Sequence, residues 1–434
     1  MATAAQPRHL ADICVTAHPF PERQIQHGCL YLTLHAAVTI CGRIHLFLAK
    51  ICPVNVLDRS APGTGDGLLA AMGSNNSVQV YQATTLALEH RLEGHTDIVS
   101  GVKFAHTNPS MLYSSSLDGT IRCCDLRVSN KKPAQILKGY EGDQFFSLDV
   151  NCDDTVVCGG CQKRMPDTNV VFWDSRTGQI MHTYPDSHSD DITQVNFHPS
   201  IPHKLASGST DGLISIFDVR QSDEDDAVEN VLNTESSVSR IGWYGPNSDK
   251  LYCVTHVETL QLWDADEADQ IGNFEDIKDY SGKELDHHAP VATIKHMKDK
   301  EVATETDDGT KKSSALGPDY LVDCYWDAQQ QKLLLAGGLH SGRLNVYKVK
   351  RKKKTLKPLY SLGDGHLSTI RCLHWQDKTQ SLVTGGEDGL LCLWKPGVDL
   401  EKETKDLSLT SQAMPGKASS SVRTRLRLHT KKPY

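Results

Sequence analysis

Short apolar runs alternate with polar turns along most of this chain, and the same order of runs returns about every 45 residues. The fullest copy extends from Gly365 to Trp394 and reads GH, LSTIRCLHW, SLVTGGEDG and LLCLW. Two further copies extend from His188 to Asp218 and from Gly94 to Asp125. Alternating apolar positions separated by Asp-Gly turns predict strands joined by tight hairpins. The repetition predicts an array of small β-units, each packed on its neighbours.

Seven such cassettes can be placed by their final runs, which end at Tyr81, Asp125, Asp174, Asp218, Asp264, Tyr347 and Trp394. The long interval before Tyr347 contains a polar segment, 281–318, which is predicted to be an exposed insertion rather than a degenerate eighth unit because it has no hairpin pattern. The array is predicted to cover residues 65–398, between an atypical N-terminal segment, 1–64, and a basic tail, 399–434. Residues 419–430 of the tail alternate arginine with apolar residues and are a candidate closing strand at an outer edge.

The charge is unevenly distributed. The chain carries a net charge of −8, yet from Lys417 to Tyr434 it has six basic residues and no acidic one. The rest of the chain is therefore acidic and a poor general binder of nucleic acid, so any RNA binding is expected to use the tail. A second basic run, Lys348–Lys357, is either a nuclear-import patch or a solvated outer strand.

Cysteine usage favours an intracellular protein in the cytoplasm, the nucleus or both. The 13 cysteines lie in apparent strands and show no regular secretory spacing, so they are predicted to be reduced thiols. Cys158 and Cys161 have the spacing of a metal or redox pair, but no second pair completes a zinc site, and buried thiols are favoured. The apolar segment Cys29–Val54 is interrupted by basic residues, so no membrane anchor is expected.

The Gly-His, Asp-Gly and Trp-Asp marks resemble those of the WD-repeat family. The resemblance implies an all-β fold, a seven-bladed β-propeller of four-stranded blades. It also implies a hydrogen-bonded tetrad of His, Ser or Thr, Asp and Trp in each complete blade. By position, these structural residues are His366, Thr384, Asp388 and Trp394 in the last blade, His188, Ser207 and Asp211 in the fourth, and His95, Ser114 and Asp118 in the second. Phe217 and Cys124 replace Trp in the latter two blades and lack the indole N–H.

A Ser, His and Asp set also suggests hydrolase chemistry. However, three similar sets at regular spacing beside tight turns favour structural braces, because a catalytic triad is needed only once. No catalytic residue, metal site or cofactor is therefore expected.

Three arginines follow a cassette aspartate by two residues: Arg127, Arg176 and Arg220. The stretch Trp173–Arg176 resembles the Trp-Asp-x-Arg element of substrate receptors of cullin-type ubiquitin ligases, in which the arginine contributes to adaptor binding. A solvated arginine in a turn is the simpler interpretation. The sequence as a whole predicts a non-enzymatic scaffold that binds other proteins or peptides. A cullin-ligase substrate receptor and an RNA-associated nuclear protein are the alternatives.

Overall fold

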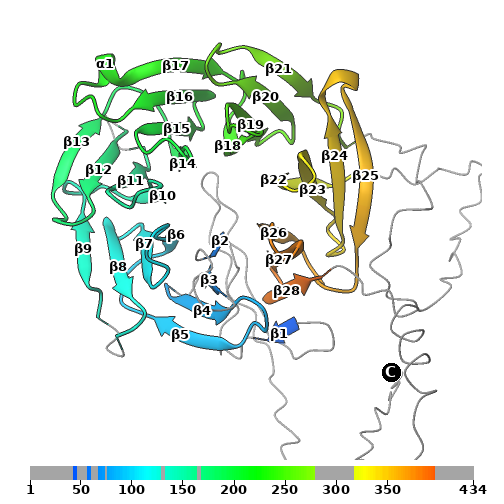
Figure 1. Cartoon of the computed structure of the whole chain (residues 1–434), viewed down its shortest axis with the longest axis horizontal. Coiled ribbons are helices and arrows are strands. Elements are labelled where there is room, and N and C mark those ends of the chain that lie inside the picture. The colour runs from blue at the N-terminus through cyan, green and yellow to red at the C-terminus, as the bar shows by residue number, and fades with distance from the viewer. Residues whose placement is uncertain are drawn as a thin grey trace, which may run out of the picture.

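The computed structural model describes residues 43–45, 56–59, 67–73, 76–128, 132–163, 168–278 and 317–395. Their strands form seven four-stranded sheets, in which every neighbouring pair that we describe is antiparallel. The sheets stand around a central opening as the blades of a seven-bladed β-propeller (Figure 1). The predicted all-β fold is confirmed.

Six blades follow chain order from an inner strand near the centre to an outer strand at the rim. Blade one consists of β2 (Val56–Arg59), β3 (Leu68–Met72), β4 (Val78–Gln82) and β5 (Leu88–Leu92). Blade two consists of β6 (Val99–Phe104), β7 (Met111–Ser116), β8 (Thr120–Asp125) and β9 (Gln135–Lys138). Blade three consists of β10 (Phe145–Val150), β11 (Val156–Cys161), β12 (Val170–Asp174) and β13 (Ile180–Tyr184).

Blade four consists of β14 (Ile192–Phe197), β15 (Lys204–Ser209), β16 (Leu213–Asp218) and β17 (Val228–Asn233), with the short helix α1 (Glu224–Ala227) before β17. Blade five consists of β18 (Val238–Tyr244), β19 (Lys250–Thr255), β20 (Leu260–Asp264) and β21 (Gln270–Phe274). Blade six consists of β22 (Tyr320–Asp327), β23 (Lys332–Gly338), β24 (Leu344–Lys350), the 3-10 turn η1 (Arg351–Lys353) and β25 (Thr355–Leu362). Blade seven contains β26 (Ile370–Gln376), β27 (Ser381–Gly386), β28 (Leu390–Trp394) and, as its outer strand, β1 (Arg43–His45).

The seven predicted cassette ends all fall on the third strand of a blade, from β4 to β28. The Asp-Gly turns lie between the second and third strands. Gly212 and Gly389 adopt φ values of 89° and 90° there, in the left-handed region that suits glycine. The Asp-Gly signal in the sequence therefore marks the middle hairpin of blades two, four and seven.

Apolar side chains pack between blades, in seven clusters that each join two neighbouring sheets. Between blades two and three, Trp173 is fully buried and meets Phe145 edge to face, with ring centroids 5.3 Å apart. Burying one such aromatic side chain stabilises the fold by about 2 kcal/mol. Because both faces of each sheet are covered, no blade can bury its apolar residues alone.

The ring closes through the two ends of the propeller. The strand β1 pairs with β28, with Arg43 opposite Cys392 and His45 opposite Leu390. Apolar residues of β3 and β4, such as Leu69 and Tyr81, share a cluster with Val383 and Leu391 of blade seven. An N-terminal strand thus occupies the outer position of the last blade.

Two boundaries differ from those predicted. Strands β1 and β2 both precede residue 65, so the propeller begins earlier than the sequence pattern indicated. These strands have no Asp-Gly turn of their own, and β1 finds its partner at the far end of the ring, so no local signal marks them. The candidate closing strand 419–430 lies outside the described residues, and within the described residues β1 pairs with the outer edge of β28.

The predicted insertion, 281–318, lies almost wholly outside the described residues. Strand β21 ends at Phe274 and β22 begins at Tyr320, and the two blades that they belong to are neighbours that share an apolar cluster. Within the described ranges, no helix is long and apolar enough to span a membrane. Most of the apolar segment Cys29–Val54 lies outside those ranges.

We predict that removing residues 1–47 lowers the melting temperature, because it leaves the outer edge of β28 unpaired and opens the ring. Removing residues 399–434 should leave the melting temperature close to that of the full chain. Thermal unfolding of both truncated proteins, followed by circular dichroism, measures this difference. A larger destabilisation by the C-terminal truncation would contradict this assignment of the closing strand.

Candidate interaction surface

The propeller has two different faces, because its strands alternate in direction. The turns between first and second strands, and between third and fourth strands, lie on one face, which we call the pocket face. The turns between second and third strands, and the crossings to the next blade, lie on the opposite face, which we call the tetrad face. Each predicted site residue can be assigned to one of the two.

The tetrad of blade seven is joined by short hydrogen bonds. His366 Nδ1 lies 3.1 Å from Asp388 Oδ1, and its Nε2 lies 2.7 Å from Thr384 Oγ1. The indole Nε1 of Trp394 donates to the same hydroxyl at 2.8 Å. Because the Asp388 carboxylate can only accept, His366 Nδ1 donates to it, and in the neutral imidazole Nε2 then accepts the Thr384 proton. The four side chains thus form one chain of hydrogen bonds.

Blades two and four contain the same arrangement without the indole. His95 lies 2.9 Å from both Asp118 and Ser114, and His188 lies 3.2 Å from Asp211 and 2.6 Å from Ser207. The aspartates also accept backbone amides. Asp118, for example, accepts the N–H groups of Thr96 and Thr120, each at 3.0 Å. Each carboxylate therefore ties the crossing from the previous blade to the turn between second and third strands.

These contacts shift the pKa of the carboxyl groups. Burial alone would raise the pKa of Asp118, but the hydrogen bonds from His95, Thr120 and the Thr96 amide outweigh it and hold the pKa well below its usual range. The pKa of Asp211 is also lowered, because bonds from His188 and two backbone amides outweigh its burial. Both groups thus favour the charged form in the folded state.

The hydroxyl groups of these sets are enclosed. Ser207 and Thr384 are completely buried, and Ser114 is 5% exposed. Each hydroxyl already bonds to its histidine, and the aspartates are occupied by turn amides. This geometry supports the structural interpretation of the three sets over a hydrolase, since a substrate could not reach the oxygen.

Blades three and five lack the histidine, and the indole N–H groups of their third strands are hydrogen-bonded differently. In blade three the indole of Trp173 donates to the carbonyl of Lys138 at 3.2 Å. In blade five the buried Nε1 of Trp263 has no hydrogen-bond partner among the described residues. We therefore expect these blades to depend more on apolar packing and their turns to be locally less stable.

The three arginines lie on the pocket face, in the turns that follow β8, β12 and β16. Arg127 and Arg220 form bidentate contacts with the aspartates two residues earlier, with Nη2 to Oδ2 distances of 2.7 Å to Asp125 and 2.5 Å to Asp218. The Arg127 guanidinium lowers the pKa of Asp125 to about 2. In contrast, the exposed guanidinium of Arg176 makes no hydrogen bond or ion pair to any residue in the described ranges, and Asp174 accepts backbone amides instead. Of the three arginines, Arg176 is the most available to a partner.

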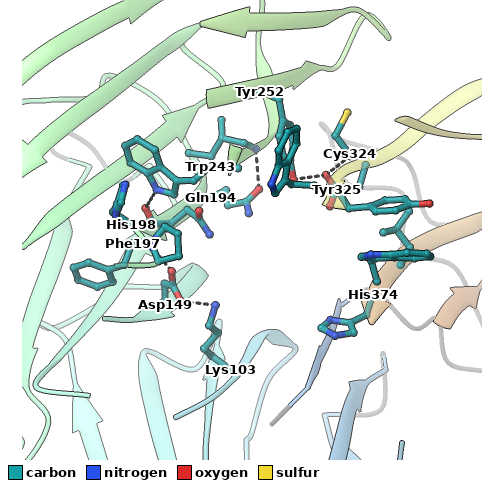
Figure 2. A pocket seen from close by; sticks show the side chains of 18 of the residues that line it. Lys103, Asp149, Gln194, Phe197, His198, Trp243, Tyr252, Cys324, Tyr325 and His374 are labelled. Atoms are coloured by element: carbon teal, nitrogen blue, oxygen red, sulfur yellow. Dashed lines mark hydrogen bonds and ion pairs between the residues drawn. The ribbon is translucent and has the colours of Figure 1, made fainter. Parts of the chain in front are cut away.

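A cavity of about 380 Å³ opens at the centre of the pocket face. The first strands of blades two to seven line it, with β19 contributing Tyr252. Figure 2 shows Trp243 and Tyr252 on one wall, Tyr325 and His374 on another, and the pair Lys103 and Asp149 below them. We call this cavity the pocket.

Three tryptophans occupy equivalent positions around the pocket. Trp243, Trp326 and Trp375 are each the third residue after the register shift in β18, β22 and β26. In blades two, three and four the same position holds Phe104, Val150 and Phe197, which are at most 4% exposed. The three indoles are only half-buried, because they extend past the contact between blades. One half of the pocket rim is therefore aromatic.

Hydrogen bonds and ring contacts orient two of these indoles. Trp243 Nε1 donates to the Asn196 carbonyl at 3.0 Å, and Trp375 Nε1 donates to Asp377 Oδ1 at 2.9 Å. Trp375 also stacks on Tyr325, with ring centroids 4.9 Å apart and an interplanar angle of 25°. A prearranged aromatic surface of this kind loses little conformational entropy when it binds a partner.

Two carboxylates inside the pocket, Asp149 and Asp323, differ in the cations and hydrogen-bond donors that offset their burial. Asp149 forms an ion pair with Lys103 at 2.9 Å and accepts the amide of Phe197 at 2.7 Å. Asp323 accepts the Tyr252 hydroxyl at 3.0 Å and its neighbour's amide at 2.7 Å, both on Oδ1. Burial raises the pKa of Asp323, and the charge of Arg240 and these hydrogen bonds offset that rise only partly.

The rim of the pocket face carries charge of both signs. The turns of blades four and five expose acidic side chains: Asp223, Asp225, Asp226, Asp266, Glu267 and Asp269. The turn of blade six exposes Arg351, Lys352, Lys353 and Lys354, which are the centre of the basic run Lys348–Lys357. That run is therefore a solvated hairpin end, and whether it also acts in nuclear import stays a prediction.

The two cysteines of the CxxC spacing do not face each other. Cys158 packs in the cluster between blades three and four, and Cys161 packs in the cluster between blades two and three. Residues three apart on a strand point to opposite sides, so these thiols cannot chelate one metal ion together. Burial raises the pKa of both thiols, as expected for apolar surroundings.

The pocket tryptophans were not singled out in the sequence, although a signal was present. Each stands directly before the first turn of its blade, in GWYG, YWDA and HWQD. Their shared position becomes visible only when the strands are aligned by register. The basic tail from Lys417 to Tyr434 lies outside the described residues.

Comparison with known proteins agrees with this architecture. The family described as "WD domain, G-beta repeat" matches residues 87–125, 178–218 and 356–395, and each match contains one of the three tetrad sets and ends at or next to a third strand. The chain belongs to the WD-repeat family, whose members are generally protein-interaction scaffolds.

Individual relatives cover most of the chain. The WD repeat-containing protein GTS1 of Arabidopsis thaliana is 30% identical over 76% of this chain and 79% of its own length. The WD repeat-containing protein 89 homolog of Dictyostelium discoideum is 28% identical over 75% of this chain and 79% of its own length. The predicted likeness to WD repeat-containing protein 89, carried by SHSDDITQVNFHPS, SGSTDGLISIFD and LVTGGEDGLLCLWKPG, is confirmed.

We predict that Asp118→Asn destabilises the protein by about 1–3 kcal/mol at pH 7, because it weakens the bonds to His95 and to two backbone amides. The folded pKa of Asp118 is lowered, so its contribution is complete above the unfolded value of about 4 and is lost as the pH falls below it. The stability difference between wild type and variant should therefore shrink between about pH 5 and pH 2.

Denaturant unfolding across this pH range measures the difference. Asp364→Asn is the control, because Asp364 is exposed and its φ of 59° suits asparagine. A hydrolytic activity lost in Asp118→Asn with unchanged stability would contradict the structural role.

Proposed function

We propose that this protein is a non-enzymatic scaffold that binds other proteins or peptides through its pocket face. The observation that carries this proposal is the convergence of three half-buried tryptophans on a central cavity. Tryptophan dominates binding energy at protein interfaces, where a fixed indole offers a large contact area. The proposal accords with the general role of the WD-repeat family.

The rim supports this choice of face. Arg127, Arg176 and Arg220 stand on three consecutive blades of the pocket face, and acidic and basic turns follow on blades four to six. Charges of both signs around an aromatic centre allow a partner to be selected and oriented. On the tetrad face the large exposed apolar residues Tyr140, Val257 and Leu367 belong to separate blades.

The compartment that we propose is the cytoplasm, the nucleus or both. None of the nine cysteines within the described ranges forms a disulfide, and eight of them are buried. This is the state expected in a reducing environment.

We predict that Trp326→Leu lowers the recovery of cellular partners about tenfold, because it removes an indole from the pocket rim. Leu367→Ser, on the tetrad face at a residue that is 79% exposed, is the control and should recover the same partners as wild type. Proximity labelling in cells followed by quantitative mass spectrometry measures both. Equal recovery by wild type and Trp326→Leu, with matched melting temperatures, would argue against the pocket face.

A substrate receptor of a cullin-type ubiquitin ligase is a second candidate, and the exposed Arg176 favours it. This arginine belongs to the complete Trp-Asp-Ser-Arg element, and its guanidinium is not held by Asp174 as Arg127 is held by Asp125. An unpaired guanidinium can make bidentate contacts with a partner carboxylate.

If this candidate is right, affinity purification of the wild-type chain should recover a cullin and its adaptor, and Arg176→Ala should lose them. Arg127→Ala is a matched control, because Arg127 is bound to Asp125 within its own turn. Absence of cullin and adaptor from both the wild-type and Arg176→Ala purifications would remove this candidate.

RNA association through the basic tail and the Lys348–Lys357 hairpin is a third candidate. The exposed side chains of Lys352, Lys353 and Lys354 favour it, since clustered cations bind phosphate. The acidic turns of blades four and five oppose it over much of the same face.

A further inference from the structure

The pocket combines exposed aromatic faces with an excess of negative charge. Its lining contains three carboxylates, Asp149, Asp323 and Asp377, and one ammonium group, Lys103. Lys103 is already paired with Asp149. Of the remaining two carboxylates, Asp377 accepts the Trp375 indole, and Asp323 lies on β22, the strand that carries Trp326.

Asp377 and Asp323 each accept two hydrogen bonds on Oδ1. The donors are the Trp375 indole and the Ala328 amide for Asp377, and the Tyr252 hydroxyl and the Cys324 amide for Asp323. The charge of Arg240 lowers the pKa of Asp323, but the two groups form no ion pair within the described ranges. The raised pKa of this carboxyl group shows that burial is not fully offset, so a further cation beside it would be stabilised.

Indole faces favour the same kind of ligand. A cation placed over the face of tryptophan is attracted by the negative potential of the ring. A guanidinium is planar, so it can stack on an indole while two of its N–H groups meet one carboxylate. It is also weakly hydrated, so moving it into a partly enclosed cavity costs less than moving an ammonium group.

We propose that the pocket binds an arginine side chain from a basic segment of a partner protein, with the guanidinium in the aromatic half of the pocket and directed to the Asp323 carboxylate. This inference rests on the proposed function and names the chemistry of the partner. Continued basic residues of the segment would lie over the acidic turns of blades four and five, where Asp266, Glu267 and Asp269 are exposed.

The six tryptophans of the chain provide an internal control for a direct test. Three of them, Trp243, Trp326 and Trp375, line the pocket, and three, Trp173, Trp263 and Trp394, do not. The full chain is labelled with 5-fluorotryptophan, and its fluorine NMR spectrum is recorded during titration with acetyl-Gly-Arg-Gly-amide. Matched tripeptides replace the arginine with citrulline, its neutral isostere, or with lysine.

The arginine tripeptide should shift the three pocket resonances saturably, with a Kd of about 1 mM, and leave the other three unchanged. The citrulline tripeptide should not bind, and the lysine tripeptide should bind several-fold more weakly. Asp323→Asn should weaken arginine binding about tenfold, whereas Glu267→Gln, which removes one charge from the same face outside the pocket, should not. Melting temperatures of both variants verify that they are folded.

Three results would overturn this assignment: no saturable shift at about 10 mM arginine tripeptide, equal shifts with citrulline or lysine, or unchanged affinity in a folded Asp323→Asn variant. The tripeptide assay is independent of the recovery of cellular partners. If Trp326→Leu loses those partners while the tripeptide does not bind, the arginine assignment fails and the scaffold function stands. If the tripeptide binds but no partner depends on Trp326, the scaffold function through this face fails.

Discussion

Each blade of this propeller depends on the apolar contact that it makes with the next blade. A four-stranded sheet of this size exposes two apolar faces, and only neighbours on both sides can cover them. Seven clusters provide that cover, and the one between blades seven and one makes the array a closed ring. Closure is reinforced by β1, which brings the N-terminal part of the chain to the edge of β28. The contacts are cooperative in the sense that losing one junction exposes two blades.

Hydrogen bonds within the polar sets of His, Ser or Thr, and Asp stabilise the turns in addition to this packing. They occur in blades two, four and seven, where a histidine joins the crossing between blades to the turn of the middle hairpin. Blades three and five lack the histidine, and their indoles are either satisfied by a carbonyl or left without a bond among the described residues. The tetrad face is therefore braced unevenly around the ring. The hydroxyl groups of these sets are buried and hydrogen-bonded to the histidines, so they are not available as nucleophiles despite their resemblance to a hydrolase triad.

On the pocket face, one position in the first strand of each blade holds a buried core residue in some blades and a pocket-lining residue in others. In blades two to four the third residue after the register shift is a Phe or Val that the neighbouring blade covers. In blades five to seven the same position holds an indole, which is larger than the contact can cover, and the excess surface faces the pocket. The backbone is unchanged between the two halves of the ring. A partner would therefore meet a polar half around Lys103 and Asp149 and an aromatic half around the tryptophans.

The sequence by itself determined the class of fold, because hydrophobic alternation, Asp-Gly turns and repetition are local features that a seven-bladed propeller requires. It also located the third strand of each blade and the three sets of His, Ser or Thr, and Asp, because the members of each set lie within a single cassette. The tertiary structure decided what depends on contacts between distant residues. It placed β1 beside β28, paired Arg127 and Arg220 with their aspartates while leaving Arg176 exposed, and brought three tryptophans from three cassettes around one cavity. Strand register and ring closure determine which of these residues come together, and a local pattern of residues does not show either of them.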